Sequence, residues 1–137
     1  MKYMLDTNIC IALIRQKSPA ILKNLISHSP GEVGISSITL AELFHGAEKS
    51  AQRDRNFSAL QEFMLPLELA DFDQQAAVAY GKIRADLERS GQVIGSMDML
   101  IAAHARSLNV ILVTNNTREF QRVKDLDLED WLQNTKE

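Results

Sequence analysis

The chain has 137 residues, 45% of them hydrophobic and 24% charged, and a formal net charge of −3. This length and composition indicate one globular domain with a hydrophobic core, residues 1–137. No apolar run approaches the ~20 residues that span a bilayer, and Asp6 comes too early for a signal peptide. The single cysteine, Cys10, excludes an internal disulfide and a cysteine metal site. We therefore expect a cytoplasmic protein without a membrane partner.

The first half of the chain alternates short apolar runs with helical patterns. The apolar run at 3–5 stops at Asp6 and predicts a buried strand; Asp6 or Thr7 is a suitable cap for the helix that follows. Pro19 suits the first position of a second helix, and Pro66 ends a later one. The predicted elements are a strand at 3–5, helices at 8–15 and from 19 to about 29–31, a strand at 33–35, and helices at 39–49 (capped by Ser36 or Ser37) and 53–64.

The second half of the chain contains the clearest signals. Asp73 predicts a helix cap and Gly91 a helix end, and Ser96 predicts the cap of another helix that runs to Leu108. Asn115-Asn116 predicts a turn, because Asn tolerates the left-handed conformation. The predicted strands are at 67–69, 110–113 and 126–128, and the apolar helix faces carry Ala76, Tyr80, Ile83 and Leu87 in one helix and Ile101, Ala102 and Ala105 in the other.

Strands that alternate with helices predict an α/β fold, with a mainly parallel central sheet of four to five short strands and helices on both faces. In such sheets the ligand site lies outside the carboxyl ends of the strands, at the topological switch point. Candidate functional residues should therefore follow strands or begin helices.

Three acids lie at such places. Asp6 follows the first strand, Glu42 comes early in a largely apolar helix, and Asp98 lies in the first turn of another helix. Each has a structural explanation of its own: a cap, a solvated helix face, and a charge that favours the helix dipole. Asn116 and Glu119 follow the strand at 110–113 and are further candidates.

Taken together, converging carboxylates favour a hydrolytic metal site. They raise one another's pKa values unless a cation neutralises them, and carboxylate oxygens suit Mg²⁺, with Mn²⁺ as a substitute. Such a site favours phosphodiester hydrolysis. The chain has no phosphate-binding P-loop, and its histidines lack zinc-site spacing. Cys10 lies in an apolar run that predicts an inert buried thiol.

Four separated motifs resemble the VapC toxins of bacterial toxin–antitoxin pairs, which are PIN-domain ribonucleases. The resemblance covers nearly the whole chain, in order and with compatible spacing. The motifs are LDTN at 5–8, SSITLAEL at 36–43 followed by GAEKS at 46–50, IGSMDMLIAAHA at 94–105, and VTNNTREF at 113–120, with Trp131 near the end.

The resemblance implies a PIN-like fold and an endoribonuclease that needs Mg²⁺ or Mn²⁺. It implies in-line attack by an activated water on RNA, which leaves a 5′-phosphate and a 3′-hydroxyl. Asp6 and Asp98 match the principal metal ligands, and Glu42 matches the acid that binds metal or orients water. Asn116 stands where many relatives have a fourth acid, so that Glu119 is the candidate to supply it. Hydrogen-bond partners expected around these acids are Thr7, Asn8 and Thr114.

The resemblance also implies partners. The expected substrate is RNA, preferably the anticodon loop of initiator tRNA, so the activity inhibits translation. A VapB-like antitoxin is expected to lay a peptide across the acidic site, often with an Arg. The chain is expected to form a homodimer and to reach operator DNA through the antitoxin. Basic residues expected to contact the RNA backbone are Lys49, Arg53 and Arg55; Lys82, Arg84 and Arg89; and Arg118, Arg122 and Lys124.

Two other functions remain open from the sequence. Asn116 at the fourth acidic position is compatible with a non-catalytic PIN-like binding or regulatory module. An acid after the first strand is compatible with a phosphatase or receiver domain, although Asn8 stands where the haloacid-type second Asp would be. The basic clusters also have a simpler interpretation as solvated helix faces.

Overall fold

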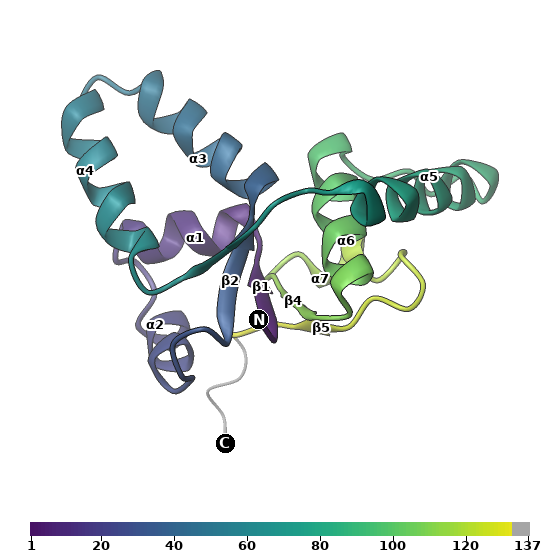
Figure 1. Cartoon of the computed structure of the whole chain (residues 1–137), viewed down its shortest axis with the longest axis horizontal. Helices are drawn as coiled ribbons and strands as arrows, with labels where there is room; N and C mark the ends of the chain where they lie inside the picture. The colour runs from purple at the N-terminus through teal and green to yellow at the C-terminus, as the bar shows by residue number, and fades with distance from the viewer. Residues whose placement is uncertain (133–137) are drawn as a thin grey trace.

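Five short parallel strands form the centre of the molecule in this computed structural model, which describes residues 1–132 (Figure 1). Their order in the sheet is β3-β2-β1-β4-β5, and every neighbouring pair is parallel. The strands are β1 (Tyr3–Leu5), β2 (Val33–Ser36), β3 (Glu68–Ala70), β4 (Ile111–Val113) and β5 (Leu128–Glu129). The predicted parallel α/β sheet is confirmed.

Helices cover both faces of this sheet. In Figure 1, α1 to α4 lie on one side of it and α5 to α7 on the other. The helices of the described residues are α1 (Thr7–Ile14), α2 (Pro19–Ile26), α3 (Ser37–Glu48), α4 (Arg53–Met64), α5 (Gln74–Arg89), α6 (Ser96–Leu108) and α7 (Thr117–Phe120).

The alternation of side chains along β1 divides the core in two. Met4 belongs to the cluster beneath α5 and α6, whereas Tyr3 and Leu5 belong to the cluster beneath α1 and α3. Successive residues of a strand point to opposite faces, so a strand buried on both faces reads as the continuous apolar run seen in the sequence. Trp131 closes the second cluster and is fully buried.

Several predicted helix ends are confirmed. Asp6 caps α1, Ser36 caps α3 and Asp73 caps α5, each through a hydrogen bond from a backbone N–H to its side chain. Just beyond α5, Gly91 adopts a φ of +68°, as expected of a glycine that closes a helix. The predicted buried faces of α5 and α6 also lie in the core.

Other local predictions were wrong. Ser96 is the first residue of α6 and does not cap it, because Gly95 occupies the N-cap without a side-chain hydrogen bond. The second helix ends at Ile26, three residues or more before the predicted end. The left-handed residue near β4 is Asn109, at the end of α6, and not Asn115 or Asn116.

The remaining differences are small shifts and one missed element. Strands β3 and β5 lie one to two residues later than predicted, and the four-residue helix α7, which was not predicted, begins just after the predicted turn at Asn115-Asn116. No helix in the described part of the chain is long and apolar enough to cross a membrane. Residues 133–137 of the predicted single domain lie outside the described residues.

Candidate active site

Asp6 lies at the carboxyl end of the central strand, directly before α1. Its Oδ1 accepts the backbone N–H of Ile9 at 2.9 Å, which caps α1. The residue is only 4% exposed, and burial raises the pKa of its carboxyl. Hydrogen bonds from the Thr114 side chain and the Ile9 backbone oppose this rise, and the charge of Glu42 adds to it. The structural and functional interpretations of Asp6 are therefore compatible.

Glu42 reaches the same place from the second turn of α3. Its carboxylate accepts a short hydrogen bond from the hydroxyl of Thr7, the first residue of α1. The Thr7 hydroxyl also lies 3.3 Å from that of buried Thr39, one turn before Glu42. Glu42 is half-buried, so it is not part of a freely solvated helix face.

Asp98, in the first turn of α6, lies close enough to three other acids for their charges to act on its carboxyl group. The pKa of its carboxyl is raised from the ordinary value of 3.8 to about 7, first by burial and then by the hydrogen bond and the charge of Glu119. The charges of Asp6 and Glu42 raise this pKa further. Four acids, one directly after β1 and the others on α3, α6 and α7, thus act on one another at the carboxyl edge of the sheet, where the strand order switches direction.

Glu119 and Asn116 occupy the corner that the sequence left unresolved. The Asn116 side chain donates to Glu119 Oε1 at 3.2 Å, and the Asn116 backbone N–H donates to the Thr114 hydroxyl at 2.9 Å. The structure thus places the carboxylate of Glu119, and not the amide of Asn116, against Asp98. Asn116 contacts the cluster through Glu119.

The chemistry of this donor set fits a divalent cation. Like charges held together in a partly buried site repel, and a cation removes that repulsion. Hard cations prefer oxygen ligands, and carboxylates, hydroxyls and backbone groups supply them here. As the side chains stand in residues 1–132, no three His, Cys, Asp or Glu residues are close enough to hold one ion. Binding would therefore draw the carboxylates inward.

A groove of about 590 Å³ opens beside the acids, between α1, α3 and α4. Thr7 and Glu42 form part of its wall, and the Asn8 side chain is exposed along it. Its basic lining comes from Arg15, His45 and Lys49. Of these only Lys49 was singled out from the sequence. The sequence does carry a signal for Arg15. It comes two helical turns after Asn8, so the two side chains lie close to the same face of α1.

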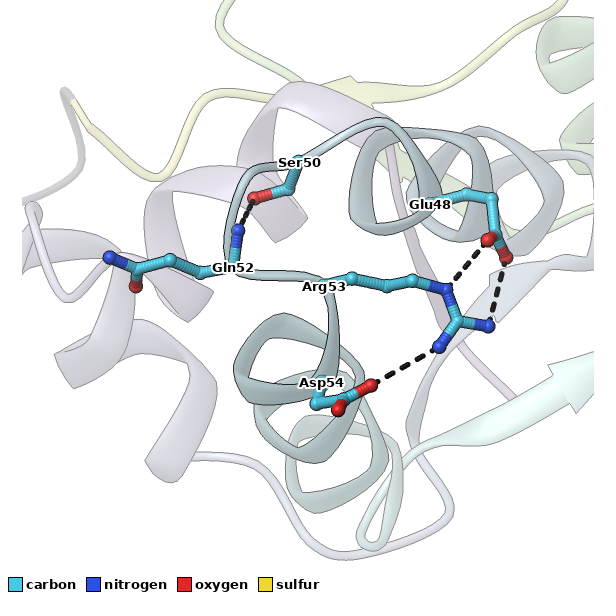
Figure 2. Close-up of polar contacts among 5 residues, drawn as sticks. All are labelled: Glu48, Ser50, Gln52, Arg53 and Asp54. Carbon is cyan, nitrogen blue, oxygen red and sulfur yellow. Dashed lines mark hydrogen bonds and ion pairs between the residues drawn. The ribbon is translucent and has the colours of Figure 1, made fainter.

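Three of the other predicted basic residues form ion pairs. Figure 2 shows the Arg53 guanidinium between Glu48 and Asp54 at the turn from α3 to α4, with Nε 2.6 Å from Glu48 Oε1. On α5, Arg84 pairs with Glu88 and Arg89 with Asp86. Exposed pairs of this kind contribute little to stability, because water screens their charges. The solvated-face interpretation thus describes these three arginines well.

Two of the predicted clusters nevertheless meet in a second groove. It has a volume of about 360 Å³ and lies between the ends of α5 and α6 and the loop after α7. Its basic lining comes from Arg89, Arg106, Arg122 and Lys124. The Arg106 and Arg122 side chains each donate a hydrogen bond to a backbone carbonyl in this region, so both also have structural roles.

The chain is similar to proteins of one family. A model of the PIN domain matches residues 3–126. A protein of Shigella flexneri, named tRNA(fMet)-specific endonuclease VapC, is 48% identical over 131 residues, which are 96% of this chain and 98% of the relative.

Two solved structures share the whole fold. DNA-bound VapBC from Salmonella typhimurium matches with a TM-score of 0.91 and 45% identity, over 96% of this chain and 98% of the other. VapBC2 from Rickettsia felis, bound to a DNA fragment from its promoter, matches with a TM-score of 0.91 and 43% identity, over 96% and 99%.

Proposed function

This chain belongs to the PIN domain family, among its VapC ribonucleases, and on that premise we propose that it is a Mg²⁺-dependent endoribonuclease toxin. Its proposed substrate is structured RNA, with the anticodon loop of initiator tRNA as the preferred site, and its proposed effect is to inhibit translation. The observation that carries the proposal is the convergence of three other carboxylates, those of Asp6, Glu42 and Glu119, on Asp98. A binding module has no need for such mutual repulsion, which weakens the non-catalytic alternative.

In this proposal Asp6 and Asp98 hold the cation, with Mn²⁺ as a possible substitute for Mg²⁺. The cation would supply a Lewis acid that activates water and stabilises charge on the phosphoryl oxygens. Burial of Asp6 in the α1 cap holds its carboxylate still, since one oxygen is bound to the Ile9 N–H. The Thr114 hydroxyl stabilises the ionised form of the same group.

Glu42 is proposed to orient the attacking water or to complete the ligand set. The Thr7 hydroxyl fixes the rotamer of Glu42 and leaves the second carboxylate oxygen for this purpose. Glu119, held by Asn116, supplies the fourth carboxylate. In-line displacement would leave a 5′-phosphate and a 3′-hydroxyl. Arg15 and Lys49 would contact phosphates of the strand that lies in the adjoining groove.

The proposed partners follow from the relatives. The similar structures are of VapBC assemblies, some of them on DNA. We infer that this chain forms a homodimer and binds a VapB-like antitoxin, which blocks the acidic site and carries the complex to operator DNA. An Arg of the antitoxin would pair with the carboxylates.

The direct test is cleavage of an initiator tRNA transcript by the purified chain, with Mg²⁺, with Mn²⁺ and with excess chelator. Asp6→Asn is the matched inactive variant, because an Asn side chain also accepts the capping N–H of Ile9 and preserves α1. We expect cleavage only by the wild type and only with metal. Equal cleavage by Asp6→Asn, or none by the wild type on any tRNA, would contradict the proposal.

A further inference from the structure

His104 is a buried histidine that the proposed chemistry does not use. It lies on α6, six residues after Asp98, and is 1% exposed. Its Nδ1 lies 2.7 Å from the hydroxyl of Ser36, which is fully buried at the end of β2. In residues 1–132 this is the one side-chain hydrogen bond that joins α6 to α3 or to the α3 cap.

The partners at this contact suit a neutral histidine ring. Ser36 Oγ already accepts the N–H of Ile38 at 3.0 Å, as the cap of α3. Its single hydroxyl proton is free to point at His104, and in the tautomer that carries the ring proton on the other nitrogen, Nδ1 accepts it. The backbone of Asp71 also lies close enough to act on the ring. Burial lowers the pKa of His104, against the nearby Asp73 and Asp71, which agrees with a neutral ring.

A third segment completes the contact. The Phe72 ring packs edge-on against His104, with centroids 5.4 Å apart and planes at 74°. The Phe72 backbone N–H donates to the Ser37 hydroxyl at 3.0 Å. The ring of His104 therefore joins α6, the start of α3 and the linker from β3 to α5 beneath the carboxylates.

Ser36 and His104 each lie six residues from an acid of the site. Six residues of helix rise about 9 Å, so a displacement of α3 against α6 at this contact moves Glu42 relative to Asp98. Hydrogen bonds made directly to metal ligands are typically worth ~10–100-fold in metal affinity or activity, and the Ser36–His104 bond acts on the ligands through the two helices that carry them.

We propose that His104 is a positioning residue: by accepting the Ser36 hydroxyl it sets the spacing of the helices that carry Glu42 and Asp98. The metal readout of this inference rests on the proposed function. A second readout, the distance between the two helices, does not.

The first experiment measures Mn²⁺ binding to the full chain by calorimetry. His104→Leu keeps the bulk but removes the acceptor, and His104→Asn keeps an acceptor near the position of Nδ1. We expect affinity to fall at least about tenfold in His104→Leu and to be largely retained in His104→Asn. Ile83→Ala, in the α5 core, is the control for lost stability alone. Equal affinities in His104→Leu and the wild type, or equal losses in His104→Leu and Ile83→Ala, would overturn the proposal.

A second pair of variants, less disruptive than His104→Leu, controls for misfolding. Ser36→Ala removes the hydroxyl together with a helix cap, and Ser18→Ala removes the comparable cap of α2, whose hydroxyl accepts the Ile21 N–H. Only Ser36→Ala should weaken Mn²⁺ binding. Equal binding by the two variants would count against a positioning role.

The second experiment uses spin labels on His45→Cys in α3 and Leu108→Cys in α6, two exposed positions. Buried Cys10 should stay unlabelled, because burial raises its thiol pKa well above the usual range. We expect a distance distribution that broadens or shifts in His104→Leu but not in His104→Asn. An unchanged distribution in His104→Leu would refute the proposal even if the chain binds no metal. Failure of wild-type metal binding alone would refute only the proposed function.

Discussion

The carboxyl groups of Asp98 and Glu119 lie close enough across the gap between α6 and α7 for one to act on the other. Two carboxyl groups held this close repel when both are ionised, so we expect one proton to be shared between them near neutral pH. The pKa of Asp98 is raised to about 7, by burial first and by Glu119 second. A cation that takes both groups as ligands must displace that proton, because metal ligands bind deprotonated.

Mn²⁺ affinity should therefore rise with pH. Between pH 6 and 7.5 we expect an increase of about eightfold in total, since a group with a pKa of about 7 loses most of its proton over this range. Calorimetry in buffers of different ionisation enthalpy measures this proton release directly. An affinity independent of pH in this range would show that Asp98 and Glu119 do not share the proton.

Without metal, the same carboxyl should destabilise the fold above neutrality. Its folded pKa lies above the ordinary value, so the folded state binds the proton more tightly than the unfolded state. The resulting stability is full below the unfolded pKa and is lost as pH rises through about 7. Asp98→Asn should raise the melting temperature by a few degrees at pH 8 and by little at pH 5. Exposed Asp127→Asn is the control and should show no such pH-dependent gain; an equal gain in both variants would contradict the repulsion.

Asn116 should contribute to activity by holding the side chain of Glu119 in place. Asn116→Ala removes the donor to Glu119 Oε1, and losses of supporting hydrogen bonds typically cost ~10–100-fold in activity. We expect a lower kcat for tRNA cleavage with a nearly unchanged KM. Glu119→Gln should lose at least as much, and adding Asn116→Ala to it should change little further. Fully additive losses would show that the two residues act separately.

Arg15 and Lys49 should contribute to RNA binding and not to chemistry. They line the groove beside Glu42, and in residues 1–132 neither forms an ion pair. Arg15→Ala and Lys49→Ala should each raise KM and leave kcat unchanged. Each should also reduce the slope of log affinity against log salt concentration by about one, because one phosphate contact is lost. Arg84→Gln, which removes a paired cation on α5, is the matched control. An unchanged KM in both variants would show that the RNA does not bind along this groove.

The sequence by itself determined the local elements and the class of the fold. An apolar run that ends at Asp6 and the cap at Asp73 depend on interactions within a few residues, so they can be read without the rest of the chain. The motifs around Asp6, Glu42 and Asp98 then identified the family that the comparisons confirm. Local reading failed at Ser96, because the backbone turn at Gly95 starts α6 one residue earlier.

Only the tertiary structure decided which side chains meet. In the sequence Asn116 stands at the fourth acidic position and Glu119 is only the candidate to supply the missing carboxylate; in the structure the short α7 carries Glu119 close to Asp98. Ser36 and His104 lie 68 residues apart, and nothing near either of them predicts their hydrogen bond. The physical reason is that strand order and helix packing bring distant side chains together, whereas caps and periodicity report only on neighbouring residues.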